Sequence, residues 1–444
     1  MLKTVEKDIR LNFDNAKKIL QNLKKIGRID TDFPYDIFME LLEHQNRDVR
    51  IEAIKNLGKY GGDYIEESLI QHFYAEIDSL AKRECISSLG RQRNYHRITF
   101  FISVLQDKDP KIVLQAIRAL LVFKYDEYVK NELLKIKEHP NEMIKEVLEI
   151  EFKEKRKKNI HHHTFVNPKL KDTIVNGDVI DTLKLLDEES IHLTFTSPPY
   201  YNARDYSFYS SYQEYLEFLR SVFKETHRVT KNGRFLIVNT SPVIVPRVSR
   251  KHSSKRYPIP FDIHNFLIQD GWEFIDDIIW KKPETSVKNR IGGFIQHRKP
   301  LAYKPNCTTE YIMVYRKKTH DLIDWNIKQY DKDIVERSKV NEEFETSNVW
   351  NIDPTFDKIH SAVFPKELCN RVIKYYSYVN DLVFDPFGGS GTFAESAINL
   401  NRSFFSTEIN ENYFTRIKER LSKYNINEKY FTLKEFQKWM QQDN

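Results

Sequence analysis

The 444-residue sequence has few cysteines and no long apolar run. Its three cysteines, Cys85, Cys307 and Cys369, stand far apart without metal-ligand spacing, so we expect free thiols and no metal site. No apolar run approaches the ~20 residues that a membrane helix needs, and the N-terminus lacks the apolar core of a signal peptide. These absences predict a cytoplasmic protein without membrane spans or a disulfide framework.

A strong excess of one charge is also lacking. The chain has 70 Lys and Arg against 64 Asp and Glu, which gives a net charge of +6. This mild excess is compatible with a polyanionic partner but does not identify one. With 40% hydrophobic residues, a chain of this length can form two or three domains, each with its own core.

Residues 1–158 predict an all-α domain with a weak internal repeat. The pairs Leu57-Gly58 and Leu89-Gly90 lie about one repeat of ~30 residues apart, and Asp48 and Asp109 stand where they could cap helices. This spacing is typical of stacked helix pairs and resembles HEAT-type repeats, although the period is shorter than usual. An irregular helical bundle is the alternative.

Two basic segments stand out in and after this domain. Arg91, Arg93, His96 and Arg97 form a cluster that suits phosphate contacts, although a solvated polar loop explains it more simply. Residues 153–163 are highly charged and end in three histidines, so we interpret them as a linker. Adjacent histidines rarely converge on one ion, and we assign them no metal role.

Farther along, an apolar run ends in two consecutive prolines. Residues 191–195 predict a buried strand, and Thr196-Ser197-Pro198-Pro199-Tyr200 follows. The prolines remove two N–H donors and hold φ near about −65°, so the chain leaves the strand as a stiff turn with outward carbonyl oxygens. Rigid acceptors beside Ser197 and the Tyr200 ring suit a planar amine, but a strand end with a surface tyrosine is equally consistent with this motif alone.

A second strand end carries a glycine-rich turn. Val383-Phe384 ends an apolar run, residues 393–400 have helical spacing, and between them lies Asp385-Pro386-Phe387-Gly388-Gly389-Ser390-Gly391-Thr392. Strand, glycine-rich turn and helix is the arrangement that binds a nucleotide-like cofactor at a helix N-terminus. The glycines allow the backbone to come close to a ligand because they have no Cβ.

This turn lacks both common phosphate-binding patterns. No Gly-Lys-Ser/Thr follows it, and G-x-G-x-x-G is absent. Glu408 ends the predicted strand 403–407, about 20 residues past the glycines, where a carboxylate can accept hydrogen bonds from ribose hydroxyls. Together these features suit an adenosine cofactor without a phosphate.

With further residues in the same order, the two motifs resemble the β-class amino-group DNA methyltransferases, which use S-adenosylmethionine. The resemblance runs from about Ile174 to about Tyr413 and includes Gly177-Asp178, Trp280-Lys281-Lys282-Pro283 and residues 360–365. It implies a Rossmann-like methyltransferase domain over 165–444, after the all-α domain. Alternating strands and helices independently predict a mostly parallel α/β sheet with helices on both faces and both motifs at strand ends.

We predict that Ser197, Pro198, Pro199 and Tyr200 are catalytic. Ser197 and the Pro198 carbonyl would accept the two amine protons and localise the lone pair on nitrogen, while Tyr200 would stack on a base flipped from the duplex. No Pro-Cys pair of the kind used by cytosine carbon-5 methyltransferases is present. The predicted cofactor-binding residues are Asp178, Phe364, Pro365, Asp385, Pro386, Phe387, Gly388, Gly389, Ser390, Gly391, Thr392 and Glu408.

Two basic insertions interrupt the alternation of strands and helices. Basic loops that rim a cleft are the electrostatic footprint of phosphate-backbone binding, although solvated loops are the alternative. The resemblance places the target-recognition insertion at about 284–345. The predicted DNA-binding residues are Arg247, Arg250, Lys251, Lys255 and Arg256 in the first insertion and Lys288, Arg290, Arg298 and Lys299 in the second.

The resemblance also bears on the substrate. Serine at the first motif position, preceded by threonine, favours cytosine N4, whereas adenine-N6 members more often carry aspartate there, so adenine N6 is the alternative. A DNA-binding or scaffold protein that has lost turnover is a further alternative, against which the intact motifs argue. Double-stranded DNA is the predicted partner, and a cognate restriction endonuclease is a candidate.

Overall fold

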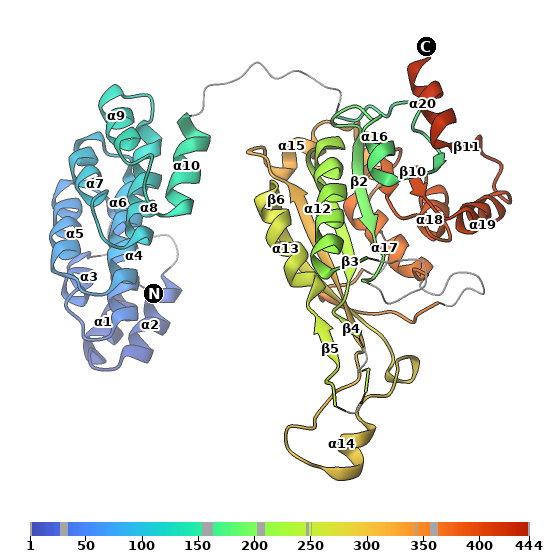
Figure 1. The fold of residues 1–444 in the computed structure, drawn as a ribbon. Coiled ribbons are helices and arrows are strands. Elements are labelled where there is room, and N and C mark those ends of the chain that lie inside the picture. The colour runs from blue at the N-terminus through green and yellow to red at the C-terminus, as the bar shows by residue number, and fades with distance from the viewer. Residues whose placement is uncertain are drawn as a thin grey trace. The chain divides into compact units, whose positions relative to one another are not determined.

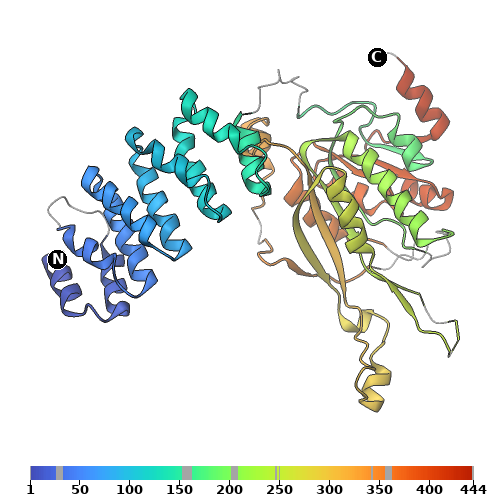
Figure 2. The ribbon, with the colours of Figure 1, turned by 60° about the vertical axis from the view of Figure 1, so that its left-hand side comes forward.

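The structure is a computed structural model that describes residues 2–26, 34–152, 163–201, 209–245, 248–249, 251–341, 344–355 and 363–442. The chain divides into two compact units, Met1–Lys158 and Asn159–Asn444 (Figures 1 and 2). The predicted linker 153–163 lies outside the described residues except for His163. Among the described residues, no helix has both the length and the apolar character needed to cross a membrane.

The first unit is built from helices throughout its described residues, as predicted. Its buried side chains form one continuous apolar core, and the helices α4, α6 and α8 pack one after another. The helices are α1 (Leu2–Leu11), α2 (Ala16–Lys25), α3 (Asp36–Leu41), α4 (Arg47–Tyr60), α5 (Asp63–Ala75), α6 (Ser79–Gln92), α7 (Ile98–Val104), α8 (Pro110–Leu120), α9 (Glu127–Lys135) and α10 (Glu142–Phe152), with 3₁₀ turns at Tyr95–Arg97 and Leu121–Phe123.

A short polar side chain caps the start of each of these three stacked helices. Asn46, Asp78 and Asp109 accept hydrogen bonds from first-turn N–H groups of α4, α6 and α8. The prediction that Asp109 caps a helix is confirmed. The prediction for Asp48 is wrong, because Asp48 already lies inside the first turn of α4 and donates its N–H to Asn46.

The repeated Leu-Gly pairs mark places where neighbouring helices nearly touch. A Cβ on Gly58 would lie 2.5 Å from the Cβ of Ser88 in α6, and a Cβ on Gly90 would lie 3.0 Å from that of Ala119 in α8. Each of these two helices, α4 and α6, therefore presents a glycine to a small residue of the next one. This close approach explains why small residues recur with the period of the sequence repeat.

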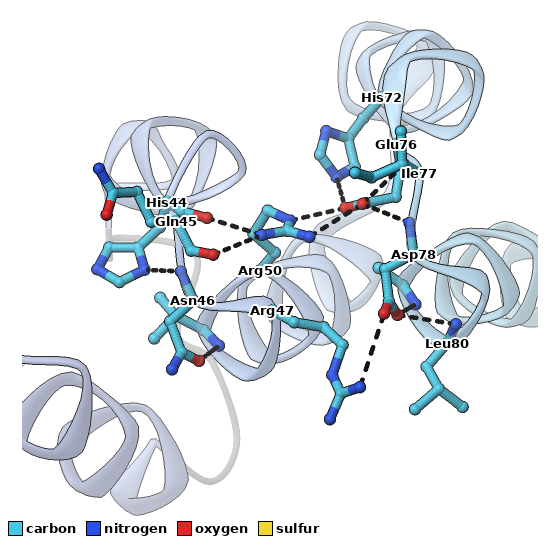
Figure 3. Close-up of polar contacts among 12 residues, drawn as sticks. His44, Gln45, Asn46, Arg47, Arg50, His72, Glu76, Ile77, Asp78 and Leu80 are labelled. Atoms are coloured by element: carbon cyan, nitrogen blue, oxygen red, sulfur yellow. Dashed lines mark hydrogen bonds and ion pairs between the residues drawn. The ribbon is translucent and has the colours of Figure 1, made fainter.

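A buried ion pair ties α4 to the connection between α5 and α6 (Figure 3). The Arg50 guanidinium donates two hydrogen bonds to the Glu76 carboxylate, at 2.7 and 2.9 Å, and one of its nitrogens donates to the carbonyl oxygens of His44 and Gln45. The N–H groups of residues 77 and 78 donate to the same carboxylate. Burial alone would raise the pKa of Glu76, but Arg50 and these N–H groups lower it to about 2.

Two of the four basic residues predicted for phosphate contact are also engaged in this unit. Arg97 forms ion pairs with Asp63, Glu66 and Glu67, and Arg91 pairs with Glu84. Arg97 therefore holds the start of α7 against the first turn of α5.

The second unit is organised by a nine-stranded sheet in the order β11-β1-β10-β9-β2-β3-β7-β6-β8. Only β7 among its described strands runs against its neighbours, so the sheet is mostly parallel, as predicted. The strands are β1 (Thr173–Asn176), β2 (Ile191–Thr196), β3 (Thr230–Thr240), β6 (Trp272–Lys281), β7 (Thr309–Lys317), β8 (Val349–Asn351), β9 (Leu382–Asp385), β10 (Ser403–Glu408) and β11 (Lys429–Thr432), and a separate hairpin pairs β4 (Val243–Val245) with β5 (Lys255–Tyr257).

Helices cover both faces of this sheet. Successive residues of β3 point to opposite sides. Ile237 belongs to the apolar core that includes side chains of α17, α18 and α19, and Leu236 belongs to the core that includes side chains of α12 and α13. The helices of this unit are α11 (Val179–Leu183), α12 (Tyr212–Val229), α13 (Ile259–Gln269), α14 (Gly292–His297), α15 (Ile323–Ile327), α16 (Lys332–Arg337), α17 (Lys366–Tyr376), α18 (Thr392–Asn399), α19 (Glu411–Leu421) and α20 (Leu433–Gln441), with a 3₁₀ turn at Glu284–Ser286.

The target-recognition role of the insertion 284–345 stays a prediction, and the structure shows which elements that segment forms. Its middle part forms β7, which lies between β3 and β6 in the sheet and has a buried apolar core. Residues 284–308 form a loop outside the sheet that contains α14, and α15 and α16 follow β7 outside the sheet.

Candidate active site

The sheet order brings the two sequence motifs together. Strands β2 and β9 are parallel neighbours, with Leu193 opposite Val383 and Thr194 opposite Phe384. Parallel neighbours end at the same edge of a sheet, so the turn after β2 and the turn after β9 leave that edge side by side. Residues far apart in the second unit's sequence thus become neighbours.

A hydrogen bond joins the two turns directly. The Thr196 hydroxyl at the end of β2 donates to Asp385 Oδ1 at the end of β9 over 2.8 Å. The same carboxylate oxygen accepts the Phe387 N–H at 3.0 Å. Asp385 therefore fixes its own turn and anchors the strand that carries Ser197, a link that neither motif alone would reveal.

The glycines of the second turn are required by close packing and by backbone geometry. Gly388 donates its N–H to the carbonyl of Thr407 at 2.9 Å, and a Cβ there would clash with the Ser406 hydroxyl. Gly391 has φ +79° where it starts α18, a conformation that residues with a Cβ rarely adopt. The turn consequently lies flat against β10 and leaves its outer side open.

Glu408, at the end of β10, closes the same edge of the sheet. Its two carboxylate oxygens accept the N–H groups of Gly389 and Asn410, each at 2.8 Å. Strand β10 lies between β1 and β9, so the carboxylate sits beside both the glycine-rich turn and the turn at Gly177-Asp178. Asp178 itself caps α11 by accepting the N–H groups of residues 180 and 181.

These turns line one cavity of about 510 Å³. The size is that of a pocket for a drug-sized ligand. Of the predicted residues, it is lined by Asp178, Ser197, Pro198, Pro199, Tyr200, Phe364, Asp385, Pro386, Phe387, Gly388, Gly389, Ser390, Thr392 and Glu408. Pro365 and Gly391 do not line it, since Pro365 precedes α17 and Gly391 starts α18.

Several lining residues were not predicted from the sequence. Tyr209 and Phe218 add aromatic surface, and Asn410 and Tyr413 add polar groups beside Glu408. Asn410 caps α19, so its identity is explained locally by helix capping, and nothing in the sequence pattern ties it to a ligand. Residues 360–362 of the predicted segment lie outside the described residues.

The two buried carboxylates of the cavity are held by neutral donors. Burial raises the pKa of Asp385 to about 7, although the Phe387 N–H and the Thr196 hydroxyl lower it. Burial also raises the pKa of Glu408 to about 7, against the lowering effect of the N–H groups of Asn410 and Gly389. In the described part of the chain, neither carboxylate has a basic side chain within ion-pair distance. Such a site favours a ligand that brings positive charge and hydroxyl donors.

A cluster of tyrosines packs around Tyr201, the residue after the Ser197–Tyr200 turn. The ring of Tyr201 lies 4.9 Å from that of Tyr257 in β5, and the rings of Tyr212 and Tyr257 lie 4.5 Å apart, centre to centre. Tyr212 is held in turn by a 2.6 Å hydrogen bond to Asp262. The stem of the β4–β5 hairpin is thus packed against the catalytic turn.

The predicted DNA-binding residues lie on this hairpin and on the loop that carries α14, both of which extend beyond the ends of β3 and β6 (Figures 1 and 2). Lys251, Lys255, Arg256, Lys288, Arg298 and Lys299 are exposed, and Arg290 is partly buried. Arg247 and Arg250 lie outside the described residues. Arg256 and Arg290 both contact the Cys307 sulfur, at 2.9 and 2.8 Å, which joins the two basic segments.

Comparison with known proteins supports the same interpretation of the second unit. A family model described as DNA methylase (N6_N4_Mtase) matches residues 191–419. The orphan methyltransferase M.BamHII of Bacillus amyloliquefaciens is 32% identical over 258 residues, which cover 53% of this chain and 91% of that protein. The type II beta methyltransferase M.BslI of Bacillus sp. (strain NEB-606) is 28% identical over 273 residues, 58% of this chain and 28% of that protein.

The type II methyltransferase M.MwoI of Methanothermobacter wolfeii is 25% identical over 255 residues, which cover 32% of that protein. The chain therefore spans only about a third of the length of M.BslI and M.MwoI. Among solved structures, a putative DNA modification methylase from Thermus thermophilus aligns with a TM-score of 0.47 at 25% identity, over 59% of this chain and 99% of that one. The cytosine-N4-specific PvuII DNA methyltransferase aligns with a TM-score of 0.44 at 21% identity, over 62% and 94%.

The family model covers just over half of the 444 residues and includes both motifs that line the cavity. This chain therefore belongs to the N6/N4 DNA methylase family.

Proposed function

We propose that the protein transfers a methyl group from S-adenosylmethionine to the exocyclic amine of a base flipped out of DNA, with cytosine N4 as the preferred target. The observation that carries this proposal is the single cavity lined both by the Ser197–Tyr200 turn and by the Asp385–Thr392 turn. One turn offers acceptors for an amine and the other offers the groups that an adenosine cofactor needs.

The residues present fit the cofactor. The backbone of 387–391 lies open to the cavity without side chains at its glycines, and Glu408 is placed for ribose hydroxyls. Asp385 provides a buried negative charge for the methionine part, Phe364 provides an aromatic wall, and Asp178 lies at the adenine side of this assignment. When bound, S-adenosylmethionine would supply a methyl group activated by its positive sulfonium.

The catalytic turn would act by holding the amine rather than by forming a covalent bond. An exocyclic amine is a poor nucleophile because its lone pair is delocalised into the ring. Ser197 and the Pro198 carbonyl would accept its two protons and so keep the lone pair on nitrogen. Tyr200 would stack against the base and hold it in place.

The preference for cytosine N4 rests on the identity of the first motif residue. Ser197 is neutral, whereas an aspartate at this place would be the stronger acceptor expected for adenine N6. Thr196, the preceding residue, favours cytosine N4 by resemblance only, because its hydroxyl donates to Asp385. Adenine N6 is the alternative within the same chemistry.

Double-stranded DNA would be held by the basic β4–β5 hairpin and by the 284–308 loop. Six of the predicted basic residues are exposed there, where they can approach phosphates. Relatives named as type II methyltransferases make a restriction endonuclease a candidate partner, and a cytoplasmic location accords with DNA as substrate.

Mass spectrometry of nucleosides tests the proposal. The full chain is incubated with labelled S-adenosylmethionine and unmethylated bacteriophage DNA, next to the Tyr200→Ala variant, and the DNA is digested to nucleosides. We expect labelled N4-methylcytosine from the wild type and at least a roughly 100-fold lower yield from the variant. N6-methyladenine would select the alternative base. Tight cofactor binding without any labelled nucleoside on genomic DNA from several sources would instead favour a DNA-binding or scaffold protein.

A further inference from the structure

Glu310 lies next to the catalytic turn but outside both sequence motifs. It is the second residue of β7, the reversed strand, and pairs with Trp280 near the end of β6. Its neighbour Tyr311 pairs with Thr240 at the end of β3. The start of β7 therefore lies at the same edge of the sheet as the ends of the parallel strands, beside the Ser197–Tyr200 turn.

Three side chains from three different elements meet at this carboxylate. The Tyr200 hydroxyl donates to Glu310 Oε2 over 3.2 Å, and Asn239 Nδ2 near the end of β3 donates to the same oxygen over 2.7 Å. Lys282, just after β6, forms an ion pair with Oε1. The Glu310 and Lys282 side chains are only 12% and 18% exposed, so water competes little for these bonds.

This arrangement holds the carboxylate in one place. The Lys282 ammonium also lies 4.5 Å above the ring of Trp280, which fixes the cation from its other side. Asn239 is 2% exposed and lies on a central strand, so it cannot move away. Because its other partners are fixed by the sheet, Glu310 is a rigid acceptor for the hydroxyl of Tyr200.

The Tyr200 ring needs such a partner because the stiff backbone of the turn does not fix the orientation of the ring. Pro198 and Pro199 have fixed φ angles, whereas the Tyr200 ring can still rotate about its two side-chain torsions. Burial raises the pKa of Tyr200, and the nearby Glu310 charge raises it further. Hydrogen bonds of the same hydroxyl with Ser241 and Ser197 lower the pKa, but burial outweighs them, so the hydroxyl remains protonated and remains a donor to Glu310. A bond at the far end of the ring sets the plane that the ring presents.

We infer that Glu310 is a positioning residue for methyl transfer, which acts through the Tyr200 hydroxyl to set the ring against which the target base stacks. This inference rests on the proposed function, and it adds β7 and the Trp280-Lys281-Lys282-Pro283 segment to the catalytic machinery. Glu310 itself does not line the cavity, so it would act without contact to the base or the cofactor.

A double-mutant cycle on the full chain tests the inference. The variants are Glu310→Met, which removes the acceptor, Tyr200→Phe and the two combined, assayed with unmethylated bacteriophage DNA for kcat and KM and with S-adenosylmethionine for Kd. We expect each single variant to lower kcat/KM for DNA about tenfold and to leave the cofactor Kd within about twofold. The combined variant should be no worse than the poorer single one, because both changes remove the same bond.

A merely structural role for Glu310 predicts a different result. The losses would then multiply to about 100-fold in the combined variant, and the cofactor Kd would rise with them. Either outcome overturns the inference. If Glu310→Met does not fold, Glu310→Ala takes its place in the cycle, since it also removes the carboxylate that accepts from Tyr200.

Crystal structures of the wild type and of Glu310→Met give a readout that does not depend on turnover. We expect one orientation of the Tyr200 ring in the wild type and a rotated or doubled ring in the variant. An unchanged ring would overturn the inference. A wild type that methylates no DNA would overturn the proposed function, while the position of the ring would still decide the role of Glu310.

Discussion

Buried carboxylates have opposite surroundings, and opposite pKa shifts, in the helical unit and in the cavity of the second unit. Glu76 in the helical unit is met by a guanidinium and two N–H groups, and its pKa falls to about 2. Asp385 and Glu408 in the cavity are met by neutral donors alone, and burial raises the pKa of each to about 7. The first arrangement is complete within the chain, whereas the second becomes complete only with a ligand of positive charge.

The second unit also contains a carboxylate of the first kind. Glu395 in α18 is buried, but Lys423, Arg420 and Tyr424 surround it, and its pKa falls to about 2 despite burial. It lies one helical turn past the glycine-rich turn and does not line the cavity. The contrast therefore distinguishes carboxylates that are paired within the chain from those that we propose to bind the cofactor, and not merely one unit from the other.

The largest expected effect comes from breaking the completed pair. Arg50→Met leaves the Glu76 carboxylate buried with its two N–H donors and the His72 ring, whose Nε2 lies 3.3 Å from Glu76 Oε2. Loss of one member of a buried pair costs about 3–5 kcal/mol. We expect the helical unit to lose about 3 kcal/mol of its free energy of unfolding, measured by urea denaturation. The cofactor Kd should not change. A loss below about 1 kcal/mol would show that Arg50 is not the partner that makes this burial possible.

The cavity carboxylate should respond in the opposite sense. Asp385→Asn keeps an oxygen that can accept the Thr196 hydroxyl and the Phe387 N–H, but it removes the negative charge. We expect S-adenosylmethionine affinity to fall about 100-fold, equivalent to ~2.7 kcal/mol, with thermal stability retained. Isothermal titration calorimetry measures the affinity. The matched control is Glu76→Gln, which should lower stability and leave the affinity unchanged.

The interactions of the site also show which of its parts can be predicted from sequence. The proline-rich and glycine-rich turns could be predicted because each follows an apolar run and has a distinctive local chemistry. The Thr196–Asp385 bond and the contact of Glu310 with Tyr200 could not, because both depend on strand order. Strand β7, which carries Glu310, runs antiparallel to its two neighbours, and no local pattern predicts this direction.

The same limit explains the wrong prediction for Asp48 and the places of Pro365 and Gly391, whose cofactor-binding role stays a prediction. Asn46 caps α4 in place of Asp48 because helix ends are set by which side chain can reach the free N–H groups, and two candidates stood two residues apart. Pro365 and Gly391 belong to the right segments but support helices α17 and α18 instead of facing the cavity. Motifs predict the segment, and packing decides which of its side chains reach the ligand.

Cofactor binding should depend on pH near neutrality. Asp385 and Glu408 have pKa values of about 7 in the free protein, and the ligand requires both in their ionised form. Affinity should therefore weaken as the pH falls, by about tenfold per carboxylate between about pH 8 and pH 6. Titrations across this range measure the dependence, with Asp385→Asn expected to have the shallower one. A flat profile in the wild type would contradict these assignments.

The free energy of unfolding should depend on pH with the opposite sign for Asp385 and Glu408. A carboxyl whose folded pKa lies above its unfolded value makes the free protein less stable as the pH rises from about 4 to about 7. Glu76, with a pKa lowered to about 2, contributes stability that is present above its unfolded pKa and is lost as the pH falls toward 2. Comparing the wild type with Asp385→Asn and Glu76→Gln separates the two contributions.

The smallest expected effect comes from replacing a single basic residue, and the test compares one such residue from each unit. Lys255 on the hairpin and Arg93 after α6 are both described side chains outside the cavity, and Lys255 is exposed. Lys255→Ala should weaken DNA binding a few-fold and reduce the slope of log affinity against log salt by about 1, because one phosphate contact is lost. Arg93→Ala should leave both unchanged, measured by fluorescence anisotropy. Equal losses in both variants would show that the helical unit also holds DNA.

The most direct test of the central claim is a crystal structure of the full chain with S-adenosylmethionine. We expect cofactor density in the cavity beside Gly388 and Gly389, with the ribose at Glu408 and the transferable methyl facing Ser197. Cofactor bound elsewhere, or a Ser197–Tyr200 turn that faces away from it, would contradict the claim that two distant motifs build one methyl-transfer site.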